Sequence, residues 1–192
     1  MLKHLVSLLI MATALCSYAQ NSNWSLEASY PYTFGDNFVD EGYNGAADVG
    51  VKYRVKEYSS FDVGVSMNVG AFIRDDSRFG NQIEASGSAV LFQPRVFTAF
   101  KLDRYPQIHP MVGIGYSIFA FSLDDQNFAG ATFQGNSSDD GINLNLAIAY
   151  DVSNHLFVQV QYDYVRLSAR DVLDSPYNRN VNIIKLGIGY RL

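Results

Sequence analysis

Two histidines are the residues best suited to acid–base chemistry in this chain of 192 residues. Enzymes that move acyl groups need a nucleophile and a general base, and the base is usually histidine. His109 and His155 are the only histidines beyond the N-terminal segment, and each lies next to a short link between apolar segments. Cys16 is the only cysteine, and the sequence has no group of His and Cys with metal-site spacing. The sequence therefore predicts no enzymatic activity, no metal site and no cofactor.

Ionisable residues inside the apolar segments are the second group that could do chemistry. They carry both signs, although only 17% of all residues are charged. Buried charges must be paired or hydrated. Two interpretations are open: a salt-bridge network that plugs an interior, which we favour, and the lining of a narrow polar pore. The members are Glu27, Asp48, Lys52, Arg54, Asp62, Arg95, Asp151, Asp163, Lys185 and Arg191.

Acidic residues are concentrated in four longer polar segments, which hold twelve of the nineteen carboxylates. Such residues keep a surface solvated, or bind divalent cations through oxygen ligands. Only 14 basic residues stand against the 19 acidic ones, with no basic patch of the kind that nucleic acid requires. We therefore expect no nucleic-acid partner. The twelve acids are Asp36, Asp40, Glu41, Asp75, Asp76, Glu84, Asp124, Asp125, Asp139, Asp140, Asp171 and Asp174.

Eight segments in which apolar and polar residues alternate must position these side chains. Period two over about ten residues is typical of a β-strand. Three short links between the segments alternate with four long ones, as in an up-and-down antiparallel sheet. The segments are Trp24–Phe34, Ala47–Lys56, Phe61–Ala71, Phe92–Phe100, His109–Ile118, Ile142–Asp151, Leu156–Tyr164 and Ile184–Leu192. The long links are Gly35–Gly45, Arg74–Ser86, Ser122–Asp140 and Leu167–Asn180.

Pro31 and Pro94 fall inside segments and each removes a ladder hydrogen bond, so we expect bulges or interface positions there.

The two faces of these segments differ in composition. One is almost entirely Val, Ile, Leu and aromatic, and the other is mainly Gly, Ser, Ala, Asn and Gln. Small residues fit the interior of an eight-stranded barrel, whereas the outside of a soluble, lipocalin-like barrel carries long charged side chains. We therefore expect the apolar face to meet lipid, and a soluble ligand-binding barrel only if the faces are reversed. Two aromatic girdles are expected from Trp24, Tyr32, Phe34, Phe61, Phe100, Tyr116, Tyr150, Tyr162 and Tyr190.

The N-terminal segment has the features of a secretory signal. A charged start is followed by an apolar run from Leu5 to Leu15, and Ser17 and Ala19 occupy the −3 and −1 positions of a small-residue cleavage site. The run is too short to span ~30 Å of hydrocarbon as a helix. We expect residues 1–19 to be a cleaved signal peptide and residues 20–192 to form one domain.

Several stretches resemble the small eight-stranded outer-membrane barrels of the OmpA transmembrane domain and OmpX type. They are His109–Tyr116, the strand–turn–strand from Leu144 through Tyr164, and the terminal Leu186–Leu192. Gln20 directly after Ala19 resembles exported proteins of Bacteroidetes-type bacteria. The resemblance implies that the last strand is read by the barrel-assembly machinery, and the matching positions are Leu186, Ile188, Tyr190 and Leu192.

The sequence thus predicts an all-β, eight-stranded antiparallel up-and-down transmembrane β-barrel in the outer membrane of a Gram-negative bacterium. We expect both termini in the periplasm, contacts with outer-membrane lipids and lipopolysaccharide, and a monomer. The favoured function is non-enzymatic: support of the envelope, or surface interaction through four long acidic extracellular loops. Loop aromatics such as Phe38, Tyr43 and Tyr177 could anchor a protein partner there or pack the loops together. The alternative is a narrow porin that passes small solutes or ions.

Overall fold

A computed structural model describes residues 23–74, 87–128, 131–168 and 175–192. The expected signal peptide, residues 1–19, lies outside these residues. The described part of the chain forms eight β-strands and two short helices. The strands are β1 (Trp24–Phe34), β2 (Tyr43–Glu57), β3 (Phe61–Arg74), β4 (Gly87–Phe100), β5 (Ile108–Phe128), β6 (Ala131–Asp151), β7 (Leu156–Leu167) and β8 (Asn180–Arg191). The helices are α2 (Phe38–Gly42) and α3 (Pro176–Arg179).

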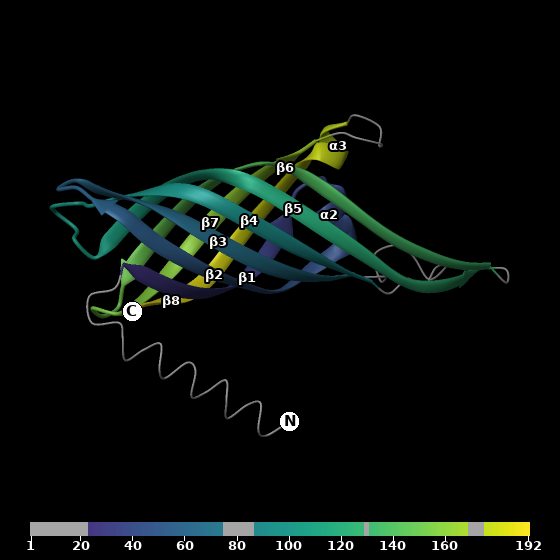
Figure 1. The fold of residues 1–192 in the computed structure, drawn as a ribbon, viewed down its shortest axis with the longest axis horizontal. Helices are drawn as coiled ribbons and strands as arrows, with labels where there is room; N and C mark the ends of the chain where they lie inside the picture. Colours follow the sequence, from purple (N-terminus) through teal and green to yellow (C-terminus); the bar gives the residue numbers. More distant parts are fainter. Residues whose placement is uncertain (1–22, 75–86, 129–130, 169–174) are drawn as a thin grey trace, which may run out of the picture.

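The strands form one closed antiparallel barrel in chain order, as the sequence predicts (Figure 1). β8 pairs with β1, for example Leu26 with Tyr190, so every strand has two neighbours. Within the described residues, no helix is both long and apolar enough to cross a membrane.

The two ends of the barrel differ in their connections. The links 58–60, 101–107 and 152–155 lie at one end, together with the start of β1 and the end of β8. We call this the short-turn end. The other end, which we call the long-loop end, carries α2, α3 and the tips of β5 and β6 (Figure 1).

The strand faces are those predicted from the alternation. Leu146, Ile188 and Leu186 point outward with 55–60% of their surface exposed, whereas Asn68 and Lys185 point inward and are fully buried. The exposed apolar face excludes the reversed, soluble arrangement, because it would leave a continuous belt of aliphatic side chains in water. The aromatic girdle at the short-turn end includes Trp24, Phe100, Tyr150 and Tyr190, all exposed on the outer face.

The prediction of a link at Ser122–Asp140 is wrong. β5 and β6 extend into this segment as a paired hairpin. Ser122 pairs with Asn136 and Leu123 with Gly135, and after a register shift Gln126 pairs with Phe133. The hairpin projects beyond the rest of the barrel in Figure 1. A strand pair that leaves the bilayer no longer needs one apolar face, so the alternation that marks a strand in the sequence disappears while the ladder continues.

Pro31 and Pro94 each face a glycine on the neighbouring strand. A Cβ at Gly45 would lie 1.7 Å from the carbonyl oxygen of Pro31, and one at Gly115 would lie 2.2 Å from that of Pro94. Pairing of β1 with β2 ends at Ser29, before Pro31, and β2 has a register shift at Gly45. On β4, Pro94 pairs with β3, but the ladder to β5 is interrupted between Phe92 and Arg95. The expected irregularities are therefore present.

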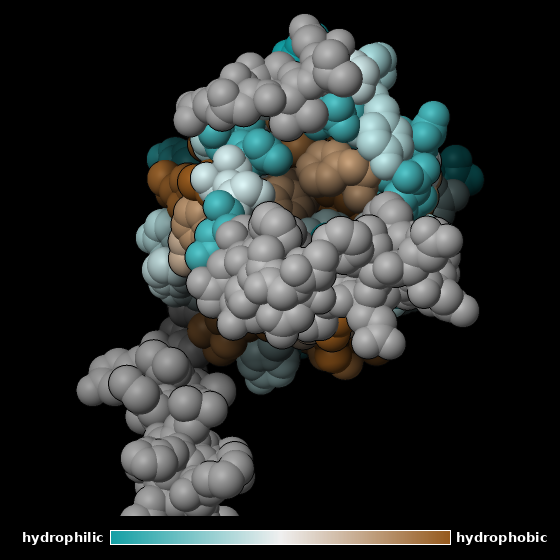
Figure 2. Space-filling view, turned by 90° about the vertical axis from the view of Figure 1, so that its right-hand side faces the viewer, coloured by the Kyte–Doolittle hydropathy of each residue, from teal (hydrophilic) through white to brown (hydrophobic). Residues whose placement is uncertain are grey.

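An apolar core fills the barrel toward the long-loop end. It consists of buried side chains from six strands and α2, and Phe38 packs against it. Figure 2 looks into this end and shows apolar side chains inside a hydrophilic rim. We call this cluster the apolar plug: Val39, Tyr43, Phe72, Ala89, Leu91, Phe119, Phe121, Val165, Leu167, Val181 and Ile183.

Candidate functional site: the barrel lumen

The middle of the lumen contains six of the predicted ionisable residues, in two ion-paired groups that amide side chains connect. We call them the central network: Glu27, Asp48, Lys52, Arg95, Asp163 and Lys185. Three are basic and three acidic, and five of their side chains are at most 2% exposed, with Lys52 at 12%. The network is therefore neutral as well as buried, as burial in a low-dielectric interior requires.

Lys185 is the centre of this network. Its Nζ lies 2.7 Å from Asp48 Oδ2 and 3.2 Å from Asp163 Oδ2, and it donates a 2.9 Å hydrogen bond to Gln93 Oε1. Arg95 Nη2 completes the pairing of Asp163 at 2.8 Å. One ammonium group thus joins carboxylates from β2 and β7, which lie far apart around the barrel.

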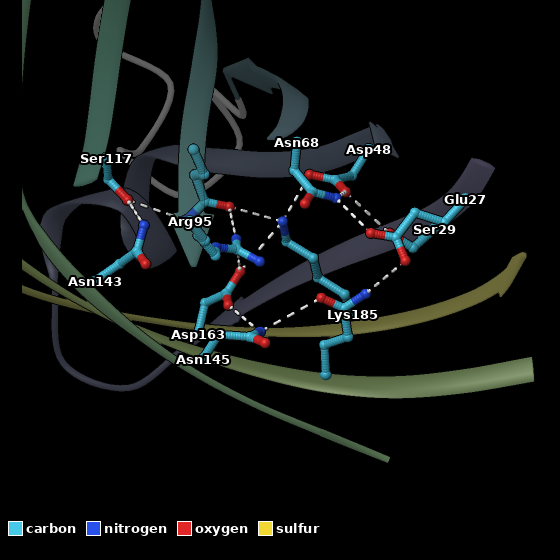
Figure 3. Close-up of polar contacts among 12 residues, drawn as sticks. Glu27, Ser29, Asp48, Asn68, Arg95, Ser117, Asn143, Asn145, Asp163 and Lys185 are labelled. Atoms are coloured by element: carbon cyan, nitrogen blue, oxygen red, sulfur yellow. Dashed lines mark hydrogen bonds and ion pairs between the residues drawn. The ribbon is translucent and has the colours of Figure 1, made fainter. Parts of the chain in front are cut away.

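Amide side chains connect the remaining charges. Asn68 Nδ2 donates to both Glu27 and Asp48, at 3.1 and 3.0 Å. Gln159 accepts from Lys52 at 3.1 Å and donates to Glu27 at 2.5 Å. Figure 3 shows Asn68, Asp48 and Glu27 meeting in the lumen beside Lys185. Each charge of the network therefore contacts at least two polar groups.

Four further predicted residues, Arg54, Asp62, Asp151 and Arg191, form a separate group nearer the short-turn end. Asp151 Oδ1 lies 2.7 Å from Arg191 Nη2, and Asp151 Oδ2 lies 2.9 Å from His109 Nε2. Arg54 lies 3.0 Å from Glu57 and 3.8 Å from Asp62. Asp62 also binds Lys101, at 2.6 Å. We call this set the rim cluster: Arg54, Asp62, Lys101, His109, Asp151 and Arg191.

The predicted set of ionisable residues therefore falls into two groups rather than one. Glu27, Asp48, Lys52, Arg95, Asp163 and Lys185 meet in the middle of the barrel. Arg54, Asp62, Asp151 and Arg191 lie in the rim cluster, where most side chains are 21–35% exposed. No salt bridge joins the two groups among the described residues.

Sequence reasoning did not single out the amides or the apolar plug. The alternation already places Asn68, Gln93, Asn145 and Gln159 on the inner face, so an excess of inward amides was the available signal. For the plug, the signal is loss of alternation toward the long-loop end, where both faces become apolar, as in Ala71-Phe72-Ile73 and Ile118-Phe119-Ala120-Phe121. Phe38 and Tyr43, predicted either to anchor a partner or to pack the loops together, pack against Phe121 inside the barrel.

The rim cluster borders a cavity of about 650 Å³ that opens at the short-turn end. Lys52 of the central network also lines it, along with Phe97, Met111 and Phe157. The cavity is thus a vestibule below the central network. It contains one candidate acid–base pair, His109 with Asp151.

The two histidines occupy the short-turn end. His109 lies at the start of β5, and His155 precedes β7 and stacks on Tyr190 with ring centroids 5.7 Å apart. In the part of the chain that the structure covers, no three His, Cys, Asp or Glu side chains are grouped so that they could hold a metal ion. The predicted terminal signal residues Leu186, Ile188 and Tyr190 lie together on the outer face of β8, followed by Leu192.

A closed barrel with an exposed aliphatic belt and a polar, ion-paired interior defines the class of transmembrane β-barrels. Within that class, a family model described as outer membrane protein beta-barrel domain matches residues 5–191. The chain belongs to this family, and its location is the bacterial outer membrane. Among curated proteins, no sequence matches it.

Solved structures with the same fold come from several bacteria. Neisserial surface protein A (NspA) has a TM-score of 0.62 and 10% identity, over 89% of this chain and 98% of that one. Ail, the attachment invasion locus protein of Yersinia pestis, has a TM-score of 0.56 and 13% identity, over 90% and 100%. The outer membrane enzyme PagL has a TM-score of 0.50 and 16% identity, over 88% and 99%. At these identities the likeness establishes the fold alone.

Proposed function

We propose that this protein is a non-enzymatic outer-membrane barrel with a sealed lumen, which supports the envelope or presents its long loops for interaction. The observation that carries the proposal is the occlusion of the lumen at two levels. Lys185 is bound between Asp48 and Asp163 in the middle of the barrel, and the apolar plug fills the lumen toward the long loops. An ion that crossed the barrel would have to displace both.

A narrow porin is the second candidate, and the vestibule favours it. About 650 Å³ of the lumen is open at the short-turn end, with polar and charged walls. In this interpretation the central network would be the lining of a constriction rather than a seal.

Planar-bilayer recording distinguishes the two candidates. The sealed barrel is expected to give no stable conductance, because an ion would have to displace both the ion pairs of Lys185 and the apolar plug around Phe119. Replacing Arg95 and Phe119 by alanine together removes a large side chain from each level and should produce measurable steps. Leu146→Ala, which shortens an outward side chain, is the matched control. Steady conductance steps from the unaltered protein, with an ion selectivity altered by Arg95→Ala alone, would establish the porin instead.

We further propose that both termini lie in the periplasm and that the long-loop end faces outward. Short turns at the periplasmic side and longer external loops are the usual arrangement in outer-membrane barrels. Asp36→Cys at the long-loop end should react with a membrane-impermeant maleimide on intact cells, whereas Ser60→Cys in the β2–β3 turn should react only after lysis. The opposite pattern would reverse the orientation.

The absence of catalysis is also part of the proposal, since PagL is an enzyme with the same fold. It is supported by the position of His109 and His155 at the short-turn end, remote from the outer leaflet in the proposed orientation. His109→Gln and His155→Gln cells should have unaltered lipid A acylation by mass spectrometry. A changed lipid A profile in either variant, restored by the native gene, would contradict it.

The partners that we propose follow from the outer surface. The aliphatic belt suits outer-membrane lipids, and the long-loop end suits lipopolysaccharide and, through its loops, a protein partner. The terminal residues Leu186, Ile188, Tyr190 and Leu192 are proposed as the signal for the barrel-assembly machinery. We expect a monomer, which sedimentation in detergent tests directly.

A further inference from the structure

The vestibule at the short-turn end is a built cavity whose walls depend on two cross-strand pairs of glycine and phenylalanine. Gly64 pairs with Phe97, and Gly189 pairs with Phe157. A Cβ at Gly64 would lie 2.5 Å from the Phe97 ring, and one at Gly189 would lie 2.0 Å from the Phe157 ring. Each ring therefore lies over a glycine on the barrel wall instead of projecting into the lumen. The result is an open volume with two aromatic walls.

The vestibule has a closed inner end. Its deepest charged residue is Lys52, whose ammonium group is fully occupied by Glu27 at 2.8 Å, Gln159 at 3.1 Å and the Met111 sulfur at 4.0 Å. Beyond it lie the other members of the central network. A molecule that enters from the short-turn end therefore stays in contact with the side chains of the vestibule.

The carboxylates deep in the vestibule are ion-paired, whereas two of its arginines have donors that are not used. The oxygens of Asp62 are bound by Lys101 and Arg54, and those of Asp151 by Arg191 and His109. Asp103, the third carboxylate in the lining, is exposed on the β4–β5 turn.

Two arginines supply the unused donors. Arg54 contacts its carboxylate partners through Nη1 alone, and Arg191 contacts Asp151 through Nη2 while lying over the Phe157 ring, 4.8 Å from its centroid. Among the described residues, the other guanidinium nitrogens of this pair form no hydrogen bond. Because a guanidinium can donate two parallel hydrogen bonds to one carboxylate, each arginine can hold an acidic group without giving up its present partner.

We propose that the vestibule is a binding site for a small organic anion, with a carboxylate held by Arg54 and Arg191 and an apolar body between Phe97, Met111 and Phe157. The volume of about 650 Å³ lies within the range of small-molecule sites. The site is independent of the proposed surface role, and binding in detergent does not depend on which way the barrel faces.

Methionine methyl resonances test this site with a control in the same molecule. Met111 lines the vestibule, whereas Met67 is exposed on the outer face of β3. In full-length protein labelled at the methionine methyl carbons, with peaks assigned by Met67→Leu and Met111→Leu, benzoate should shift Met111 in a saturable manner with a dissociation constant in the millimolar range. Met67 reports any partition of the probe into the detergent. Benzamide and benzylamine have the same size with no charge and positive charge, and should bind at least tenfold more weakly.

Arginine variants test the proposed donors. Arg54→Gln and Arg191→Gln should each weaken benzoate binding at least tenfold, because a charge-assisted bond is lost. Arg104→Gln is the matched control, since Arg104 is on the same end of the barrel but lies over Tyr105 and outside the lining. Heat-modifiable migration confirms that each variant is folded.

Three results would overturn the proposal. They are no saturable shift of Met111 with benzoate, equal or tighter binding of benzylamine, and equal loss of binding in Arg191→Gln and Arg104→Gln.

Discussion

The central network and the rim cluster are built from the same residue types on the inner face of the same barrel, yet they are organised differently. In the centre, Lys185 and Asp163 are fully buried, and amides such as Asn68 donate further hydrogen bonds to the carboxylates. At the rim, Arg54 and Arg191 keep 29% and 21% of their side-chain surface exposed beside an open volume. The difference shows that amides and depth, rather than the number of charges, decide whether an ionic group seals a lumen or leaves it accessible.

The largest expected effect comes from removing the central cation. Lys185→Met leaves Asp48 and Asp163 without the ammonium that both contact, and stranding a buried charge costs about 3–5 kcal/mol. Lys101→Met at the rim should cost less than about 1 kcal/mol, because Lys101 is 35% exposed and water can replace it. Urea unfolding in detergent or lipid measures both. Equal losses would show that the two groups do not differ in the way described.

The next largest loss of stability is expected from a charge placed on the outer face of β8. Leu186 is the outward neighbour of Lys185 and is 60% exposed to the surroundings of the barrel. Leu186→Arg should destabilise by about 2–4 kcal/mol near the bilayer midplane, and Val55→Arg near the short-turn end by about 0–1 kcal/mol. Folding titrations into lipid vesicles provide the values. A Leu186→Arg variant as stable as the unaltered protein would contradict the assignment of the lipid face.

A smaller effect is expected from the walls of the vestibule. Gly189→Ala forces the Phe157 ring to move, because the added Cβ would lie 2.0 Å from it. We expect a loss of about 1–3 kcal/mol. Gly113→Ala, whose nearest contact would be 3.2 Å, should cost less. The same unfolding measurement applies, and a neutral Gly189→Ala would mean that the ring position does not depend on this glycine.

The smallest effect concerns a contact outside the barrel wall. Tyr177 of α3 donates a 2.5 Å hydrogen bond to Glu41 of α2, and this bond raises the pKa of Tyr177 from 10.0 to about 12. Folding therefore favours the neutral phenol, so the contact is intact below pH 10 and is lost as the pH rises through about 12. In a pH titration followed by ultraviolet absorbance, the difference between the unaltered protein and Tyr177→Phe should show one phenolate that forms only near pH 12.

Glu41→Gln provides the control for this titration. It removes the charged acceptor and should return the midpoint for Tyr177 toward the ordinary tyrosine value. A midpoint that is already ordinary in the unaltered protein would show that α2 and α3 are not joined by this bond in solution.

The strand number, the antiparallel order and the assignment of faces were predictable from the sequence, because a bilayer and a filled lumen impose strict alternation on each span. Leu186 and Lys185 illustrate this, since they are adjacent in the chain and lie on opposite faces. The protruding β5–β6 hairpin was not predictable, because neither of its faces has to be apolar. The apolar plug was missed for a related reason: where both faces are apolar, as around Phe119, alternation gives no information.

The candidate site was predictable in its members but not in its division. Because Lys52 and Arg54 are two residues apart in one strand, the alternation alone places both on the inner face. It does not reveal that Lys52 reaches Glu27 and Gln159 in the centre while Arg54 stays with Glu57 and Asp62 at the rim. Side-chain direction along the barrel axis decides this, and it depends on where amides and glycines leave room.

The pairing of β1 with β8 has a consequence for how the barrel assembles. Ser25 and Arg191 are neighbours in this ladder although they lie at opposite ends of the described chain. The entropy of closing so long a loop is recovered only when the last strand docks, and contacts of this range slow folding. Until then, two strand edges carry unpaired backbone groups that hydrocarbon does not tolerate. Insertion must therefore wait for the whole chain, and a chain without its last strand would have no stable place in the bilayer.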